Sequence, residues 1–249
     1  MSFDAVTLTA VGILFAGTLV RSTLGFGNAL ITMPLLALIM SPTRAAPLVA
    51  VVSLLSGVVI LIEHRRDLHL ASVWRFLVSA AVGIPIGVFG LVHLSADVIH
   101  LVLGVVVLGF AAFQLIHPEH VRLTSHHPAF AFGLVAGVLG GSYNTNGPPI
   151  VIYGTLRHWT RHQFRATLQG LFVPAGVMAV FWHGTQGLLT ADVLRLWAVS
   201  LPTTILAFVL GRYLSRRLKP KPFVLAVHVF LLAMGASLVI RSVRALWGS

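Results

Sequence analysis

The chain alternates long apolar stretches with short polar ones. Seven stretches come close to the roughly 20 residues with which a helix crosses a hydrocarbon core about 30 Å thick. They cover residues 6–20, 45–62, 73–92, 98–116, 166–182, 193–210 and 223–240. This pattern predicts an all-α, polytopic integral membrane protein.

Two polar, glycine-rich segments interrupt the apolar pattern at residues 21–28 and 140–149, and we call them the first and the second break. An unpaired backbone group in hydrocarbon costs several kcal/mol, so non-helical backbone survives there only where protein covers it or where it lines a cavity. The apolar pieces that follow, residues 29–40 and 148–156, make about 18 Å and about 14 Å of helix and are too short to cross. We expect two half-helices that Asn28 and Asn146 cap.

The two halves of the chain repeat the same order of segments: a span, a polar break, a short apolar piece and three full spans. Faint matches such as Gly17 with Gly137 agree with a duplication, although chance resemblance is the alternative. We therefore expect one transmembrane domain over residues 1–249, with repeat 1 at 1–116, a linker at 117–128 and repeat 2 at 129–249. Each repeat is a re-entrant, broken-helix hairpin plus three transmembrane helices, which gives about eight membrane-crossing elements.

Basic residues give this arrangement an orientation. If each break is the tip of a re-entrant hairpin, twelve of the 17 Lys and Arg residues fall on one side, which the positive-inside rule makes cytoplasmic, with Met1 outside. The two hairpins then enter from opposite faces and the repeats are inverted, as in secondary transporters of the cell membrane. In the alternative topology the short pieces tilt and cross fully, and the charge balance becomes worse.

Composition excludes other classes of function. With 57% hydrophobic and 9% charged residues, the chain is unlike a soluble domain. The net charge of +11 resides mostly in short loops beside the spans, where it indicates orientation and contact with lipid headgroups rather than with nucleic acid. The chain has no cysteine and no sequence motif of a metalloprotease, a serine hydrolase or a phosphate-binding loop. We expect no enzymatic activity, no cofactor and no metal site.

The breaks carry the residues that are suited to binding a solute. Half-helix N-termini offer free amides and a positive dipole, both of which favour an anion. All six acidic residues fall in termini, loops or span edges, so no carboxylate is left inside for a cation. The candidate substrate-binding residues are Arg21, Gly25, Gly27, Asn28, Gly141, Ser142, Tyr143, Asn144, Thr145, Asn146 and Gln169.

Two structural alternatives compete with a binding role. The guanidinium of Arg21 can hold a carboxylate or a sulfonate with paired hydrogen bonds, or it can reach the outer interface from the end of a span. The polar side chains of the second break can bind a solute, or they can cap helices and join neighbouring helices by hydrogen bonds.

The motifs around the breaks are similar to those of a known family. GFGNALITMP at residues 25–34, GLVAGVLGG at 133–141 and NGPPIVIY at 146–153 resemble the TauE/SafE sulfite exporter family, also called TSUP. The resemblance implies a permease of the cytoplasmic membrane for sulfur-containing or organic anions such as sulfite, sulfoacetate or thiosulfate. It also implies that Gly25, Gly27, Gly140 and Gly141 are the motif glycines. The chain departs from many relatives at Asn28, where they have a small residue, and in its polar residues 143–146.

Together these observations predict a secondary-active transporter of small anions that works by alternating access around a site at the membrane midplane. The alternatives are an anion channel and a membrane scaffold or assembly subunit that transports nothing. A coupling proton or sodium ion and a homo-oligomer are open at this point, and His183 and His228 are the histidines within spans that a proton pathway would use.

Overall fold

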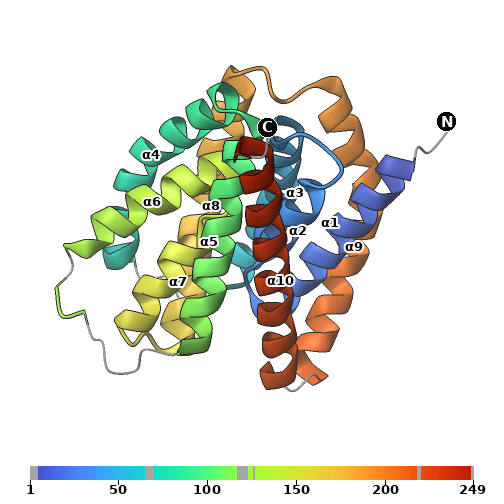
Figure 1. Cartoon of the computed structure of the whole chain (residues 1–249). Helices are drawn as coiled ribbons and strands as arrows, with labels where there is room; N and C mark the ends of the chain where they lie inside the picture. The colour runs from blue at the N-terminus through green and yellow to red at the C-terminus, as the bar shows by residue number, and fades with distance from the viewer. Residues whose placement is uncertain (1–4, 65–69, 117–122, 126, 218–219, 248–249) are drawn as a thin grey trace.

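The computed structural model describes residues 5–64, 70–116, 123–125, 127–217 and 220–247, and within them it is all-helical, as predicted (Figure 1). The helices are α1 (Ala5–Leu24), α2 (Asn28–Leu36), α3 (Pro42–His64), α4 (Leu70–His93), α5 (Ala96–Ile116), α6 (Pro128–Tyr143), α7 (Gly147–Leu156), α8 (Arg161–Thr185), α9 (Ala191–Arg217) and α10 (Pro220–Trp247). The predicted linker at 117–128 lies largely outside the described residues.

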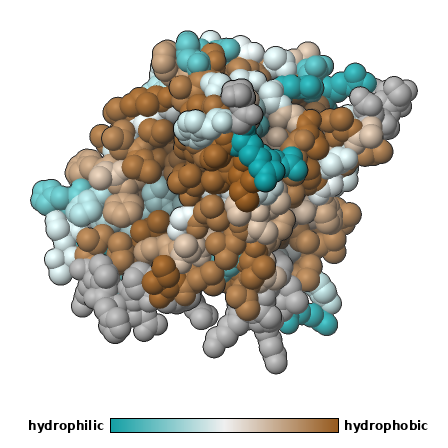
Figure 2. All heavy atoms as spheres, in the orientation of Figure 1, coloured by the Kyte–Doolittle hydropathy of each residue, from teal (hydrophilic) through white to brown (hydrophobic). Residues whose placement is uncertain are grey.

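Six of these helices are long and apolar enough to cross a membrane, namely α1, α3, α4, α5, α9 and α10. Shorter apolar stretches occupy α6 and residues 170–185 of α8. Large apolar side chains on the outer faces are exposed, among them Val78, Ile86 and Phe89 of α4. Figure 2 shows one face of the molecule as mostly hydrophobic, with smaller hydrophilic patches at its upper end, near its centre and at its edges. The protein is therefore a multi-pass membrane protein whose apolar surface faces lipid.

Both breaks form tight hairpins between helices. In the first, α2 folds back along α1, so that Gly17 lies against Asn28 and Thr32, and a side chain at Gly17 would clash with both. In the second, the Leu123 amide before α6 donates a hydrogen bond to the carbonyl of Leu156 at the end of α7 (2.9 Å). The second hairpin thus begins and ends at neighbouring points, which is the geometry of a re-entrant element.

The first half-helix is shorter than the sequence predicts and is capped differently. α2 ends at Leu36 rather than at Met40, whose amide closes a turn onto the Leu36 carbonyl (2.9 Å). Pro34 lies in the last turn and has no amide hydrogen to continue the helical ladder. The N-cap is Gly27 with a φ of 97°, a left-handed conformation that favours glycine, and Asn28 is the first residue of the helix.

Asn146 occupies the N-cap of α7 as predicted, but its side chain makes no capping hydrogen bond. Neither Asn28 nor Asn146 therefore acts as a cap through its side chain. This leaves both amide groups for other partners.

The helices of the two halves pack in equivalent pairs. α1 packs on α9, and its counterpart α6 packs on α4, while α5 packs on α10 and α3 on α8. When α1–α5 are exchanged in order with α6–α10, the same set of pairs results. This favours two repeats that are related by an approximate two-fold axis. Figure 1 shows α1 descending and α6 rising in the same view, in agreement with inversion.

Glycines allow the closest of these contacts, between α4 and α6. A Cβ on Gly137 would lie 2.7 Å from the Cα of Ala80, and one on Gly83 would lie 3.0 Å from the Cα of Gly137. A Cβ on Gly87 would clash with the Val138 carbonyl. The small residues at four-residue spacing thus serve backbone-to-backbone packing, and they hold the second hairpin against α4.

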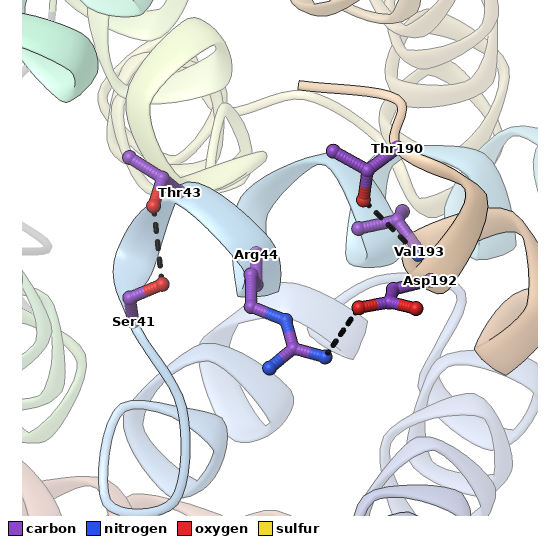
Figure 3. A network of polar contacts seen from close by, with 6 residues as sticks. All are labelled: Ser41, Thr43, Arg44, Thr190, Asp192 and Val193. Carbon is purple, nitrogen blue, oxygen red and sulfur yellow. Dashed lines mark hydrogen bonds and ion pairs between the residues drawn. The ribbon is translucent and has the colours of Figure 1, made fainter. Parts of the chain in front are cut away.

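At the opposite end from the basic loops, an ion pair joins the starts of α3 and α9 (Figure 3). Arg44 Nη2 lies 3.7 Å from Asp192 Oδ2, and the two side chains are 55% and 75% exposed. An exposed pair of this kind contributes at most about 1 kcal/mol. Arg44 therefore lies at the surface and is not one of the residues of the interior.

Candidate functional site

The two breaks meet at one cavity in the middle of the bundle, which we call the polar chamber. Its volume is about 30 Å³, which is room for about two water molecules. The residues around it are Arg21, Gly27, Asn28, Ala29, Leu30, Ser53, Leu54, Asn144, Thr145, Asn146, Gly147, Phe172 and Gly176. Hairpins that are about 120 residues apart in the sequence therefore border a single cavity.

Each half supplies equivalent elements to the polar chamber: one hairpin tip and one long helix. The first half adds Ser53 and Leu54 of α3, and the second adds Phe172 and Gly176 of α8. The N-termini of α2 and α7 both border the chamber, so their amides and dipoles favour negative charge there. The contributions are unequal, because Pro148 and Pro149 remove two amide hydrogens from the first turn of α7.

Arg21 brings the one positive side chain among the described residues around the polar chamber. It lies in the last turn of α1, is only 6% exposed, and its Nε has no hydrogen-bond partner. The guanidinium carbon is 5.7 Å from the centre of the Phe172 ring, a cation–π contact from the other repeat. Gly57 of α3 leaves room for the guanidinium, since a Cβ there would lie 2.9 Å from Nη2. The side chain points into the protein rather than to the interface.

Two asparagines face the polar chamber from opposite hairpins. Asn28 is 2% exposed, and its Nδ2 donates to Ser53 Oγ (2.9 Å), while its Oδ1 has no partner. Asn144 donates from Nδ2 to the Val49 carbonyl (3.2 Å) and has a left-handed φ of 53°. Buried polar atoms are nearly always hydrogen-bonded. Nε of Arg21 and Oδ1 of Asn28 are two exceptions to this rule, and both residues border the polar chamber.

Comparison with known proteins assigns the family. The model of the family described as sulfite exporter TauE/SafE matches residues 9–238. The chain belongs to the sulfite exporter TauE/SafE family. A relative from Cupriavidus necator, described as a probable sulfite/organosulfonate exporter TauE, is 26% identical over 243 residues, which are 94% of this chain and 93% of the relative. The comparison with solved structures found no significant match. TauE/SafE proteins are membrane exporters rather than enzymes, as the motifs had implied.

The four TauE/SafE motif glycines occupy four different environments. Gly27 borders the polar chamber, and Gly25, with a φ of 90°, turns the chain one residue before Phe26. Gly140 faces the Asn146 side chain, to which a Cβ would approach within 3.3 Å. Gly141 lies against α4, and its carbonyl accepts a hydrogen bond from Nε2 of the buried His183 (2.8 Å). Gly25 and Gly141 are thus not among the residues around the chamber.

Ser142 and Tyr143 also lie outside the polar chamber and make contacts between helices. Ser142 Oγ donates to the Gly87 carbonyl of α4 (3.0 Å), and the Tyr143 hydroxyl donates to the Ile99 carbonyl of α5 (3.0 Å). For these two side chains the structure favours the alternative of inter-helix hydrogen bonding. Thr145 and Asn146 do border the chamber. Gln169 belongs to α8, but its side chain lies outside the described residues.

Sequence reasoning missed the walls that α3 and α8 contribute. Ser53 was hidden as one small polar residue within a long apolar stretch, and Phe172 had no feature to separate it from other span residues. The repeat was the one usable signal, because the two positions lie 119 residues apart, close to the offset of the halves. Among the described residues no group of three His, Cys, Asp or Glu side chains is placed to hold a metal ion.

Proposed function

We propose that this chain is a secondary-active permease that moves sulfur-containing or organic anions, with sulfite and organosulfonates as the first candidates, through the polar chamber. The observation that supports this most is the buried Arg21, whose Nε lacks a partner and which borders the same cavity as two helix N-termini. Among the residues that the structure describes, none around the chamber is a carboxylate. The printed description of the Cupriavidus necator relative, a probable sulfite/organosulfonate exporter, agrees with this cargo.

The proposed binding mode follows from the donors around the polar chamber. A planar guanidinium offers two parallel N–H groups to two oxygens of a sulfite or sulfonate group, which a lysine cannot do. The first-turn amides of α2 face the same space and add to the positive potential. Asn28, whose side chain is held by Ser53, forms part of the wall beside these donors.

Alternating access is the proposed mode of movement. The hairpins come from the two repeats, enter from opposite sides in the topology predicted from charge, and meet at the chamber, which is the arrangement of many secondary transporters. Rocking of one repeat against the other exposes the chamber to each side in turn. In this proposal the protein lies in the cell membrane with Met1 outside and the basic loops in the cytoplasm.

Uptake of radiolabelled sulfite into proteoliposomes, with and without an imposed proton or sodium gradient, tests the proposal. A coupled carrier accumulates sulfite beyond its own electrochemical equilibrium and shows counterflow against unlabelled sulfite inside. Flux that never passes this equilibrium indicates a channel, and the absence of flux for sulfite and organosulfonates indicates a scaffold. The variant Arg21→Gln serves as the control for flux that does not pass through the polar chamber.

A further inference from the structure

A second and larger cavity adjoins the polar chamber, and we call it the apolar chamber. Its volume is about 280 Å³, against about 30 Å³ for the polar one. Gly27 and Leu30 of the first hairpin border both cavities, so the two are neighbours across that hairpin tip. Gly27 has no side chain to close the junction, and a Cβ there would meet nothing nearer than Val20 at 3.9 Å.

The wall of the apolar chamber differs in character from that of the polar one. Phe26, at the tip of the first hairpin, packs edge-on against Phe110 of α5 and Phe164 of α8, with ring centres 6.5 and 6.3 Å apart. Apolar residues of α7 and α10 complete most of the surface, among them Val151 and Val227. The polar groups that the structure describes at this wall are few and neutral or weakly basic: Gln114, Thr155 and His228.

The apolar chamber lies on one side of the tip of the first hairpin. Apart from the residues of the first hairpin, its wall comes from the C-terminal parts of α5 and α7 and from the N-terminal parts of α8 and α10, the ends that lie at the bottom of Figure 1. The basic loops follow at the same end, so this cavity lies between the polar chamber and the side that the charge distribution predicts to be cytoplasmic.

The two chambers are suited to different parts of one solute, namely an anionic group and a carbon chain. The polar chamber has the charge and donors for an oxyanion but little room for anything attached to it. An apolar cavity of about 150 Å³ in another protein is known to take up benzene, and the apolar chamber here, at about 280 Å³, is larger. A carbon chain of several atoms fits its volume and its wall, whereas a second charge would face no counter-charge among the described residues.

We propose that the apolar chamber is a subsite for the carbon skeleton of an organic anion, whose sulfonate group is held at Arg21 in the polar chamber. The preferred substrates are then alkanesulfonates with an uncharged tail of several carbons, and inorganic sulfite is the minimal substrate that uses the polar chamber alone. This inference rests on the proposed function, because it requires that the polar chamber binds the anionic group.

Competition measures the subsite directly. Radiolabelled sulfite counterflow into proteoliposomes is inhibited with methane-, propane- and pentanesulfonate, and the concentration for half-inhibition is compared. Burial of each added methylene is expected to lower this concentration about two- to fourfold. Val227→Trp, which fills the apolar chamber, is expected to abolish the dependence on chain length when the half-inhibition concentration of each alkanesulfonate is divided by that of unlabelled sulfite in the same variant.

The matched control is Val229→Trp, since Val229 lies on the same helix but is 57% exposed on its outer face. It should keep the native dependence on chain length. If Val227→Trp does not fold, the smaller change Val224→Phe at the same wall replaces it, and a native circular dichroism spectrum and elution profile establish folding.

Three results would overturn the subsite. They are equal inhibition by all chain lengths in the native protein, equal loss of sulfite and alkanesulfonate binding in Val227→Trp, and a co-purified phospholipid, seen by native mass spectrometry, that Val227→Trp releases without changing the chain-length series. Should the native protein show no sulfite counterflow, thermal shifts with the same sulfonates report binding without transport. Chain-length dependence in those shifts would support the subsite while the transport proposal fails.

Discussion

Replacing Arg21 by glutamine removes the one basic side chain among the described residues around the polar chamber. The substitution keeps a polar side chain of moderate length in place and takes away the charge and the planar fork. If Arg21 holds the anion, binding weakens. If it is only a structural residue, the folded protein loses stability and binding does not change selectively.

The substitution is expected to weaken binding of the anion without lowering the stability of the substrate-free protein. A hydrogen bond to a charged group contributes about 1.5 to 3 kcal/mol, so losing the guanidinium contacts raises the apparent KM roughly 10- to 150-fold. In the empty protein, Arg21 makes a cation–π contact with Phe172 and has no ion pair among the described residues. Loss of that contact costs about 0.5 to 2 kcal/mol, whereas a buried, unpaired charge costs several kcal/mol. The substrate-free variant should therefore be as stable as the native protein or more stable.

The assay compares sulfite counterflow in proteoliposomes with the melting temperature of the detergent-solubilised protein. Arg21→Lys, which keeps the charge but not the fork, should fall between the native protein and Arg21→Gln in KM. Arg44→Gln is the control, because that arginine is exposed and lies outside the chamber. A melting temperature several degrees lower together with an unchanged KM would refute the assignment of Arg21 to the anion.

Three other predictions follow from the geometry. Asn146→Ala should reduce transport at least several-fold with little change in melting temperature, since its side chain makes no capping hydrogen bond; parallel losses of activity and stability would contradict this. Gly87→Ala should cost about 1 to 3 kcal/mol in overpacking against α6, whereas Gly90→Ala on the same helix, where the nearest atom is 3.6 Å away, should melt like the native protein. In this cysteine-free chain, Ser125→Cys should react with an impermeant maleimide only from the cytoplasm and Gln186→Cys only from outside; the reverse pattern would overturn the orientation.

The half-helices show how far local reasoning reaches. The two breaks and the re-entrant hairpins were predictable because an unpaired backbone group in lipid is expensive wherever it occurs, and the cost is set by a few neighbouring residues. The end of α2 was not predicted, since residues 37–40 are apolar and continue the hydropathy of the helix. The cap was misassigned for a related reason: Gly27 adopts a left-handed conformation, which frees Asn28 to bind Ser53.

Within the breaks, the sequence could not tell which polar side chains face the chamber. Asn28 and Asn144 border it, while Ser142 and Tyr143 donate to carbonyls of α4 and α5. All four are small or amphipathic residues in a polar segment, and their direction depends on the rotation of each hairpin against helices that lie far away in the chain. Ser53 and Phe172 reach the chamber by the same long-range packing.

The sequence by itself determined that the chain lives in a bilayer, that its helices are broken at two related places, and that Arg21 is the one charge within those breaks. These properties follow from transfer energies that add up residue by residue along the chain. Only the tertiary structure decided that the breaks meet, that Arg21 points inward with its Nε lacking a hydrogen-bond partner, and that an apolar chamber adjoins the polar one. The physical reason is that cavities arise where packed helices fail to fill the space between them, and that depends on side chains from both halves of the molecule at once.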